Sequence, residues 1–248
     1  MLNDDVLACA GIVERGDPWR FRTLMAAPLE ARAILFPVYA FNVEGSRAPW
    51  VTQEPMIAEM RLQWWRDALE EIASGAAVRR HEVVTPLSKL LSPQDAKGLD
   101  EAVAARRWDI YRDSFEDEGH FDRYIDQTAG HLMWTAAKLL GHKDEAGTRA
   151  LGYAAGLAAY FRAVPALEAA GRIPLLDGTP AGVKALAQRG LEQFNKRTRK
   201  ANPAHWPAAG TRRTLAGITR NPECVGQGGV TEDPGAFALI KASVFGRL

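Results

Sequence analysis

Apolar residues recur at helical spacing along most of the chain, and no convincing run alternates apolar and polar residues as a strand would. Gly16-Asp17-Pro18 ends a first helix and restarts the chain, and prolines at positions 28 and 55 open later helices. The pattern therefore predicts an all-α protein. Its expected helices cover residues 4–15, 28–43, 55–72, 84–91, 94–110, 121–140, 146–169 and 180–200.

The periodic pattern weakens after residue 200. Asn202-Pro203, Asn221-Pro222 and the glycine-rich segment at residues 226–229 are typical of loops. We therefore expect one helical domain over residues 1–200 and a loosely packed helical tail over residues 201–248.

Charge and hydropathy narrow the function classes. The formal net charge of +1 gives no basic excess of the kind that nucleic-acid binding needs. No apolar run approaches the roughly 20 residues of a membrane-spanning helix. The acidic N-terminus does not resemble a signal peptide, and two distant cysteines, Cys9 and Cys224, fit neither a disulfide framework nor a zinc site. We expect a cytoplasmic protein that does not bind nucleic acid.

Few side chains indicate a catalytic or metal-binding function by themselves. The five histidines are scattered, and a lone His81 or His131 is more typical of a core or capping residue than of a metal ligand. The adjacent Trp64 and Trp65 point about 100° apart on a helix, so at least one packs between helices while the other is free to line a cavity or a rim. Composition alone favours plain core packing for this segment.

Five segments, taken in order, resemble the squalene/phytoene synthase family over about residues 18–176. They are residues 32–41 with Tyr39-Ala40-Phe41, residues 62–75 with Trp65-Arg66, His81-Glu82-Val83-Val84 (where Glu82 departs from the family), residues 124–133 with Ala129-Gly130, and residues 151–175 with Arg162 and Gly171-Arg172-Ile173-Pro174-Leu175. The resemblance implies the terpenoid synthase-like fold, a prenyl-synthase helical bundle around a central cavity.

In active members of that family, two aspartate-rich motifs hold magnesium ions that neutralise the departing pyrophosphate. The resemblance would place the aspartates of the first motif at Ser46, Arg47 and Trp50, and those of the second at Ala163 and Leu167. Both sets of carboxylates are missing, and Glu44 lies off the expected positions. We therefore expect no catalytic residues, no metal site and no cofactor, with magnesium required only if the protein is an enzyme after all.

Other positions of the family frame could still bind a ligand. The arginines among them match phosphate geometry and could pair with an anionic head group, although interhelical salt bridges explain them equally well. The candidates for lining a cavity or binding a head group are Arg32, Tyr39, Glu44, Trp65, Tyr124, Arg162 and Arg172.

One branch of the family, the assembly factors of respiratory complex I, has likewise lost the acidic motifs. Phe41-Asn42-Val43-Glu44, residues 60–65 and residues 161–165 resemble that branch. The leading hypothesis is therefore a catalytically degenerate protein that binds a complex I subunit or an isoprenoid-like ligand and assists assembly. The alternative is a diverged prenyltransferase that condenses two prenyl diphosphates, with Glu44, Glu59 and Asp109 supplying a rearranged metal site.

A third reading is peripheral contact with the inner membrane. The basic stretch Lys196-Arg197-Thr198-Arg199-Lys200 could touch anionic lipid at about 1 kcal/mol per basic residue. A solvated helix end, where cations favour the helix dipole, explains the same residues.

Overall fold

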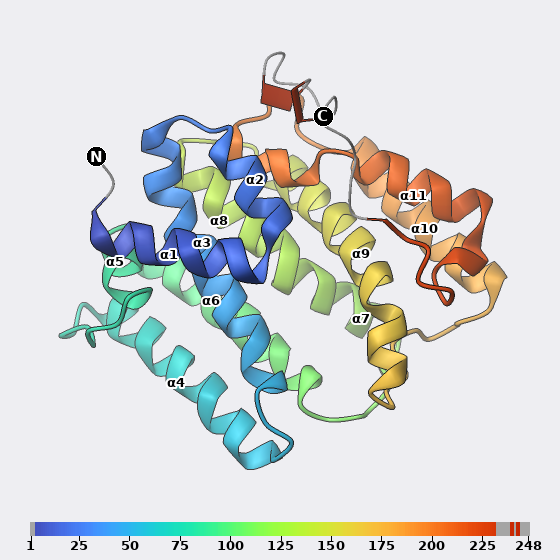
Figure 1. The fold of residues 1–248 in the computed structure, drawn as a ribbon, viewed down its shortest axis with the longest axis horizontal. Coiled ribbons are helices and arrows are strands. Elements are labelled where there is room, and N and C mark those ends of the chain that lie inside the picture. The colour runs from blue at the N-terminus through green and yellow to red at the C-terminus, as the bar shows by residue number, and fades with distance from the viewer. Residues whose placement is uncertain (1–2, 232–238, 241, 244–248) are drawn as a thin grey trace. The chain divides into compact units, whose positions relative to one another are not determined.

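The structure is a computed structural model that describes residues 3–231, 239–240 and 242–243 (Figure 1). Every regular element in these ranges is helical, which confirms the predicted all-α class. The elements are α1 (Asp4–Gly16), α2 (Pro18–Met25), α3 (Leu29–Arg47), η1 (Ala48–Trp50), α4 (Pro55–Ser74), α5 (Val84–Ser88), α6 (Pro93–Ala105), η2 (Arg106–Asp109), α7 (Glu118–Ile125), η3 (Asp126–Gly130), α8 (His131–Leu139), α9 (Glu145–Ala169), α10 (Pro180–Asn195), η4 (Pro203–Ala208), α11 (Thr211–Arg220) and η5 (Pro222–Cys224). Of the short elements, η3 is a π-helical turn and the others are 3₁₀ helices.

Capping side chains explain where several of these helices begin. The Asp17 carboxylate accepts a hydrogen bond from the Arg20 backbone N–H at 2.9 Å, so α2 restarts at the predicted break. Ser92 and Asp95 form a reciprocal capping box at the start of α6. Thr179 caps α10 by accepting from the Gly182 N–H at 3.2 Å.

Some helices end earlier than the sequence pattern predicts. The helix expected over residues 180–200 ends at Asn195, because the N–H groups of Lys196 and Arg197 bond to carbonyls only three residues back and tighten the last turn. The helix expected over residues 121–140 is interrupted by η3, and that over residues 84–91 ends at Ser88.

The chain packs as two compact units. The first contains the described residues of 1–111 and 134–143, and the second contains the described residues of 112–133 and 144–248. The domain boundary that the sequence pattern places at residue 200 stays a prediction.

In the first unit, α1 packs on α2 and α3, and α4 lies along α6 (Figure 1). The face of α4 toward the core carries Leu62, Trp65 and Leu69, spaced three and four residues apart as a helical stripe requires. All three are at most 6% exposed. Gly16 lets α1 approach α3 closely, since a Cβ there would lie 2.3 Å from Val43 Cγ1.

In the second unit, α9 packs against η3, α10 and α11. Gly152 and Gly156 of α9 face Ala129 and Gly130, and a Cβ on Gly152 would lie 2.8 Å from the Ala129 carbonyl oxygen. The family-like Ala-Gly pair is thus half of a small-residue contact between two helices.

The described part of residues 201–248 includes a packed helix, α11. In α11, Leu215 and Ile218 are at most 1% exposed and the helix packs on α10, so this part of the tail belongs to the core of the second unit. Residues 232–238, 241 and 244–248 of the expected tail lie outside the described residues.

Across the described ranges, no helix combines the length and the apolar character needed to cross a bilayer.

Candidate functional site

The first unit contains a groove of about 600 Å³ where α3 ends and α4 begins. Helix α3 and η1 form one wall, and the first half of α4 forms the other. One of its residues, Arg47, is a position at which the sequence resemblance would place an aspartate of the first acidic motif. Its lining residues are Glu44, Arg47, Ala48, Val51, Ile57, Met60, Arg61, Trp64, Trp65 and His81.

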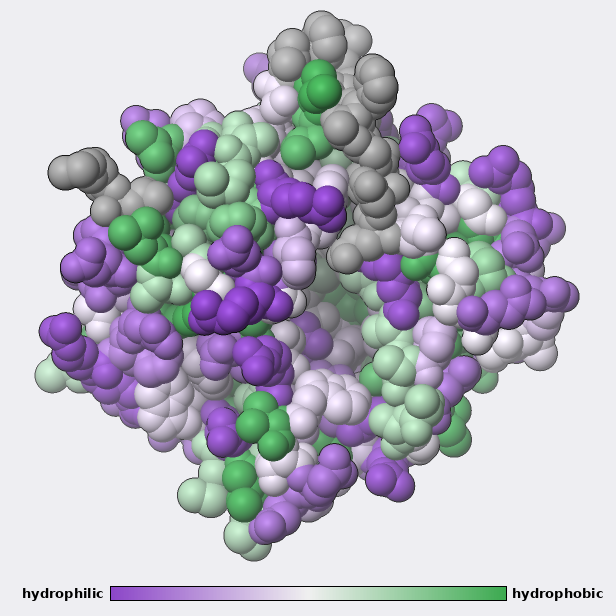
Figure 2. All heavy atoms as spheres, in the orientation of Figure 1, coloured by the Kyte–Doolittle hydropathy of each residue, from purple (hydrophilic) through white to green (hydrophobic). Residues whose placement is uncertain are grey.

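Helix α4 can line this groove because it is apolar on two faces. One stripe, described above, is buried toward the core. A second stripe, Met56, Met60 and Trp64, repeats every four residues and so shares another face of the helix. Met56 is 76% exposed and Met60 is 67% exposed. Figure 2 shows hydrophobic atoms gathered at the lower end of the face in view, where Figure 1 places the beginning of α4.

Aromatic rings form the floor of the groove. The Trp65 ring is nearly buried and meets Phe41 and Trp64 edge to face, with ring centroids 5.5 and 4.9 Å apart. The His81 ring lies 5.0 Å from Trp64 and 5.5 Å from Trp65. His81 Nδ1 accepts a hydrogen bond from the Val83 N–H at 3.1 Å, so the imidazole is held in place as a local capping group. The floor is therefore apolar and held by packing.

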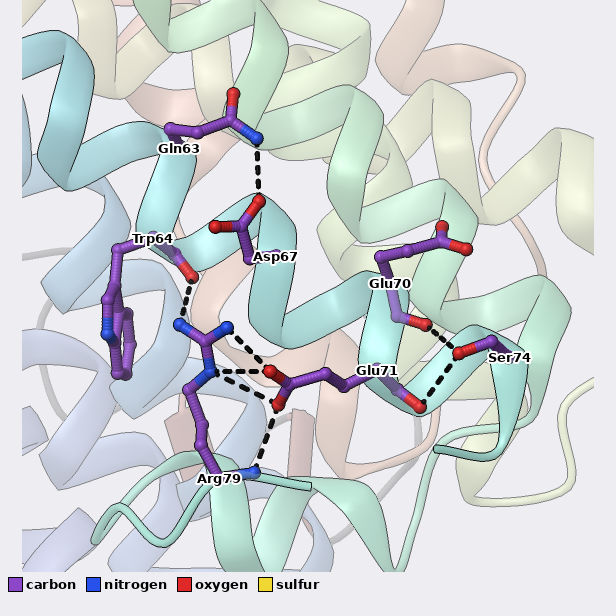
Figure 3. Close-up of polar contacts among 7 residues, drawn as sticks. All are labelled: Gln63, Trp64, Asp67, Glu70, Glu71, Ser74 and Arg79. Carbon is purple, nitrogen blue, oxygen red and sulfur yellow. Dashed lines mark hydrogen bonds and ion pairs between the residues drawn. The ribbon is translucent and has the colours of Figure 1, made fainter. Parts of the chain in front are cut away.

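A guanidinium group supports the Trp64 ring (Figure 3). The Arg79 Cζ lies 4.9 Å from the centroid of this ring, and Arg79 Nη1 donates to the Trp64 carbonyl oxygen at 3.3 Å. Arg79 in turn donates from Nη2 and from its backbone N–H to the Glu71 carboxylate, at 2.6 and 3.0 Å. These hydrogen bonds hold the pKa of Glu71 below its usual value. The loop that carries Arg79 is thus fastened to α4 directly behind the groove.

The rim of the groove is more cationic than anionic. Arg47 is 63% exposed and its Nη1 lies 3.8 Å from Glu44 Oε1, a loose ion pair. Arg61 is exposed and has no ion pair with any residue that the structure describes. Two guanidinium groups therefore face a single carboxylate.

The carboxylates that a rearranged magnesium site would need are engaged elsewhere. Glu59 Oε1 accepts from Arg107 and from the Tyr111 hydroxyl at 3.0 and 2.9 Å, and Asp109 pairs with Arg106 at 3.3 Å. Within the described residues, no three histidine, cysteine or acidic side chains converge as a metal site would require. Because magnesium needs several oxygen ligands, these residues do not fit it.

Several predicted residues of the first unit have structural contacts outside the groove. Arg32 donates from Nε to the Ala27 carbonyl at 2.7 Å and from Nη2 to the Met25 carbonyl at 2.6 Å, and so satisfies the end of α2. Tyr39 is 1% exposed beneath the Arg20 guanidinium, and its burial raises the pKa of the phenol to about 12. Ser46 Oγ donates to the Val43 carbonyl at 3.0 Å.

Other predicted residues belong to the second unit. Tyr124 is 5% exposed in a ring cluster with Phe115 and Tyr160, at centroid distances of 5.5 and 6.1 Å. Leu167 is buried, while Arg162, Ala163 and Arg172 are half-buried. Of the predicted positions, the groove brings together Glu44, Arg47 and Trp65, and Trp50 lies beside it in η1 with 43% of its surface exposed.

Sequence reasoning missed much of the groove wall. Val51, Ile57, Met60, Arg61 and His81 were not among the predicted site residues, although they line it. The signal available in the sequence was the second apolar stripe on α4. A helix that packs against the core on one side needs a single apolar stripe, so a second stripe indicates a further contact surface.

A second concavity, in the second unit, is lined mainly by charged and polar residues, and its carboxylates have partners. Asp126 pairs with Arg149, and Asp122 accepts from the Tyr153 hydroxyl at 2.5 Å. Asp144 caps α9 by accepting from the Gly147 N–H at 2.9 Å. Since its carboxylates already have partners, the groove at α4 is the stronger candidate site.

Two curated proteins show the similarity of this chain to known sequences. The assembly factor 6 homologue of NADH dehydrogenase (ubiquinone) complex I from Drosophila melanogaster is 29% identical over 166 residues, 63% of this chain and 50% of that protein. The Homo sapiens protein of the same description is 25% identical over 173 residues, 63% of this chain and 48% of that protein. The chain thus spans about half the length of these curated relatives.

The fold has a solved counterpart. A crystal structure of a dehydrosqualene synthase in complex with ligand superposes with a TM-score of 0.68 at 15% identity, covering 97% of this chain and 94% of that one. The described helices therefore have the terpenoid synthase-like fold. The family model described as squalene/phytoene synthase matches residues 13–175. With two thirds of its length matched and five family-like segments in order, the chain belongs to the squalene/phytoene synthase family.

Proposed function

We propose that this protein assists the assembly of respiratory complex I by binding a partner protein, and that it does not catalyse prenyl transfer. The proposal is supported by relatives that carry the name complex I assembly factor 6 and match 63% of this chain. The observation that supports it at the site is an apolar groove, rimmed by Arg47 and Arg61, where the family resemblance would place the first acidic motif.

The chemistry of the groove argues against prenyl diphosphate ionisation. That step needs clustered magnesium ions to neutralise the leaving pyrophosphate, and magnesium needs carboxylate ligands one helical turn apart. At the corresponding turn of α3 this chain has Arg47, whose charge repels a metal, next to the half-buried Glu44. An exposed apolar surface is instead typical of a site that another molecule covers.

We further propose that the protein acts in the cytoplasm beside the inner membrane, where complex I is embedded. A contribution of the basic stretch at residues 196–200 is weakened by its packing, because the Arg197 guanidinium lies 4.3 Å from the Phe194 ring centroid and Thr198 is 7% exposed. Co-sedimentation with anionic liposomes at low salt tests whether the protein contacts the membrane through this stretch. Protein that stays in the supernatant would contradict such contact.

Deletion of the gene in its source organism tests the assembly role. We expect less assembled complex I on native gels and lower NADH:quinone activity in membranes, both restored by the wild-type gene, with succinate dehydrogenase activity unchanged as a control. Fully assembled and fully active complex I in the deletion strain would overturn the proposal.

Turnover of farnesyl and geranylgeranyl diphosphate with magnesium tests the prenyltransferase alternative. We expect no pyrophosphate release above a heat-killed control from protein that is folded by circular dichroism. Release that a chelator abolishes would establish a rearranged metal site and an enzymatic function.

A further inference from the structure

We propose that the groove at the start of α4 is a docking site for an amphipathic helix of a partner protein, which places apolar side chains against Met60 and Trp64 and a carboxylate beside Arg61. This inference deepens the proposed function and rests on it for the existence of a protein partner.

The shape of the apolar surface suits a helix. Met56, Met60 and Trp64 are spaced over eight residues of α4, a stripe about 12 Å long at 1.5 Å per residue. Two turns of a partner helix have about the same length and present apolar side chains at matching intervals. Val51 and Ile57, 54% and 39% exposed, extend the apolar surface on either side of the loop between η1 and α4. Exposed methionines adapt to such partners because their side chains are flexible and polarisable.

The charges at the rim define the polarity of the partner. Arg61 has no ion pair within the described part of the chain, and Arg47 is bound only loosely by Glu44. Glu59, one position before Met60, is turned away into its pairing with Arg107. A partner helix with acidic residues beside its apolar stripe would form ion pairs with these arginines, whereas a helix with basic residues there would be repelled.

A protein helix fits this surface better than a lipid bilayer does. The floor formed by Trp64, Trp65 and His81 is recessed within a groove of about 600 Å³, which a protruding side chain can reach. A bilayer surface does not extend into such a recess, so the recess favours a helical polypeptide with protruding side chains.

Binding of designed peptides to the full chain tests the proposal. The probe is a fluorescein-labelled amphipathic helix of about 18 residues, long enough to hold a helix, with leucines on one face and glutamates flanking them. A second peptide carries lysines in place of the glutamates, and a third has the same residues in scrambled order. We expect saturable binding of the glutamate peptide by fluorescence anisotropy, binding at least about 10-fold weaker for the lysine peptide, and none for the scrambled one.

Groove variants and matched controls locate the binding. Met60→Glu is expected to weaken the binding of the glutamate peptide about 10-fold or more. Arg61→Glu is expected to make the protein bind the lysine peptide more tightly than the glutamate peptide. Leu7→Glu on α1 and Lys97→Glu on α6 make the same chemical changes at exposed positions outside the groove, and should alter binding less than about 2-fold. No saturable binding of the glutamate peptide, or equal loss in groove and control variants, would overturn the proposal.

Two further measurements test whether a membrane or a second copy of this chain covers the groove instead of a partner helix. Co-sedimentation with anionic vesicles that Met60→Glu abolishes would assign the surface to the membrane instead. A dimer in sedimentation velocity that Met60→Glu dissociates would assign it to a second copy of this chain. Either result would overturn the docking of a partner helix.

The deletion strain distinguishes failure of this inference from failure of the assembly role. In the deletion strain, expression of Met60→Glu or Arg61→Glu is expected to leave the amount of assembled complex I low. Expression of Leu7→Glu or Lys97→Glu is expected to restore that amount. Full restoration by the groove variants would refute the docking site and leave the assembly role intact. Normal complex I in the deletion strain itself would refute the assembly role.

Discussion

The Arg79 guanidinium lies 4.9 Å from the centroid of the Trp64 ring while it donates to both oxygens of Glu71 (Figure 3). Trp64 is one of the aromatic residues of the groove floor, so a loop residue outside the groove holds part of its floor. The position of this ring therefore depends on a contact that does not itself face a ligand.

Replacing Arg79 with glutamine should loosen this part of the site. The variant loses the cation–π contact and the ion pair to Glu71, and we expect the midpoint of thermal unfolding to fall by roughly 2–4 °C. Peptide binding at the groove should weaken although Arg79 does not line it. A double-mutant cycle with Glu71→Gln should show coupling; additive effects of the two substitutions would contradict the linkage.

Lys138 and Asp95 join α8 to the start of α6 in the first unit. Lys138 Nζ lies 2.6 Å from Asp95 Oδ1, and Asp95 is 7% exposed. Lys138→Met leaves this carboxylate buried with only its capping partner, so we expect a loss of about 1–3 kcal/mol in the free energy of unfolding by urea. Lys97→Met, an exposed change on α6, is the matched control and should be near neutral. Adding Asp95→Asn to Lys138→Met should recover part of the loss.

The cost of Lys138→Met should depend on pH. Burial, the largest single influence on Asp95, favours its neutral form, but hydrogen bonds from Lys138 and Ser92 outweigh it and hold its pKa below the usual value. The folded protein thus binds this proton less tightly than the unfolded chain does. The stabilisation is complete above the unfolded pKa of about 3.9 and is lost as the pH falls through the lower folded value. The difference between wild type and variant should therefore be larger at pH 7 than at pH 3, and an equal difference would contradict this account.

The two thiols should differ in reactivity. Cys9 is fully buried, and burial, followed by the charges of Glu82 and Asp5, raises the pKa of its thiol to about 12. Because the thiolate fraction is then about 1,000-fold smaller than for an ordinary thiol, a thiol reagent at pH 8 should label only Cys224 in the folded protein and both cysteines in denaturant. Labelling of folded Cys224→Ser at the rate of a free thiol would refute the burial of Cys9.

The same raised pKa predicts an alkaline limit to stability. The folded protein holds the Cys9 proton more tightly than the unfolded chain does, so the stabilisation is present below the ordinary thiol pKa of 9.0 and is lost as the pH rises from there toward about 12. The Cys9→Ala variant should show a weaker decline in urea stability between pH 8 and pH 10 than wild type does.

Gly152 should tolerate no side chain. A Cβ there would meet the Ala129 carbonyl oxygen and the Gly130 Cα, both at 2.8 Å and both backbone atoms. We expect Gly152→Ala to cost about 1–3 kcal/mol, since α9 and η3 must move apart. Gly217→Ala is the control: nothing lies within 4 Å of its Cβ position in α11, and the better helix former should stabilise by about 0.5–1 kcal/mol. Equal effects of the two substitutions would contradict the close approach.

Much of the local structure follows from the sequence. Proline at a first helical turn and a capping Asp17 fix where α2 begins, because these are interactions between residues at most a few positions apart. The absence of carboxylates at Ser46, Arg47 and Trp50 is likewise visible in the chain alone. The helix ends were less predictable, because the tightened turn after Asn195 depends on hydrogen-bond geometry that periodicity does not encode.

Only the tertiary structure decided which side of α4 forms the groove. Two apolar stripes with helical spacing, one through Leu62 and Trp65 and one through Met60 and Trp64, compete in the sequence, and periodicity cannot rank them. Packing on α6 buries the first stripe and leaves the second open. Glu59 was equally undetermined, because the arginine that withdraws it from the groove is 48 residues away along the chain. Contacts between residues so far apart in the sequence depend on how the helices pack, and the local spacing of apolar residues does not determine that packing.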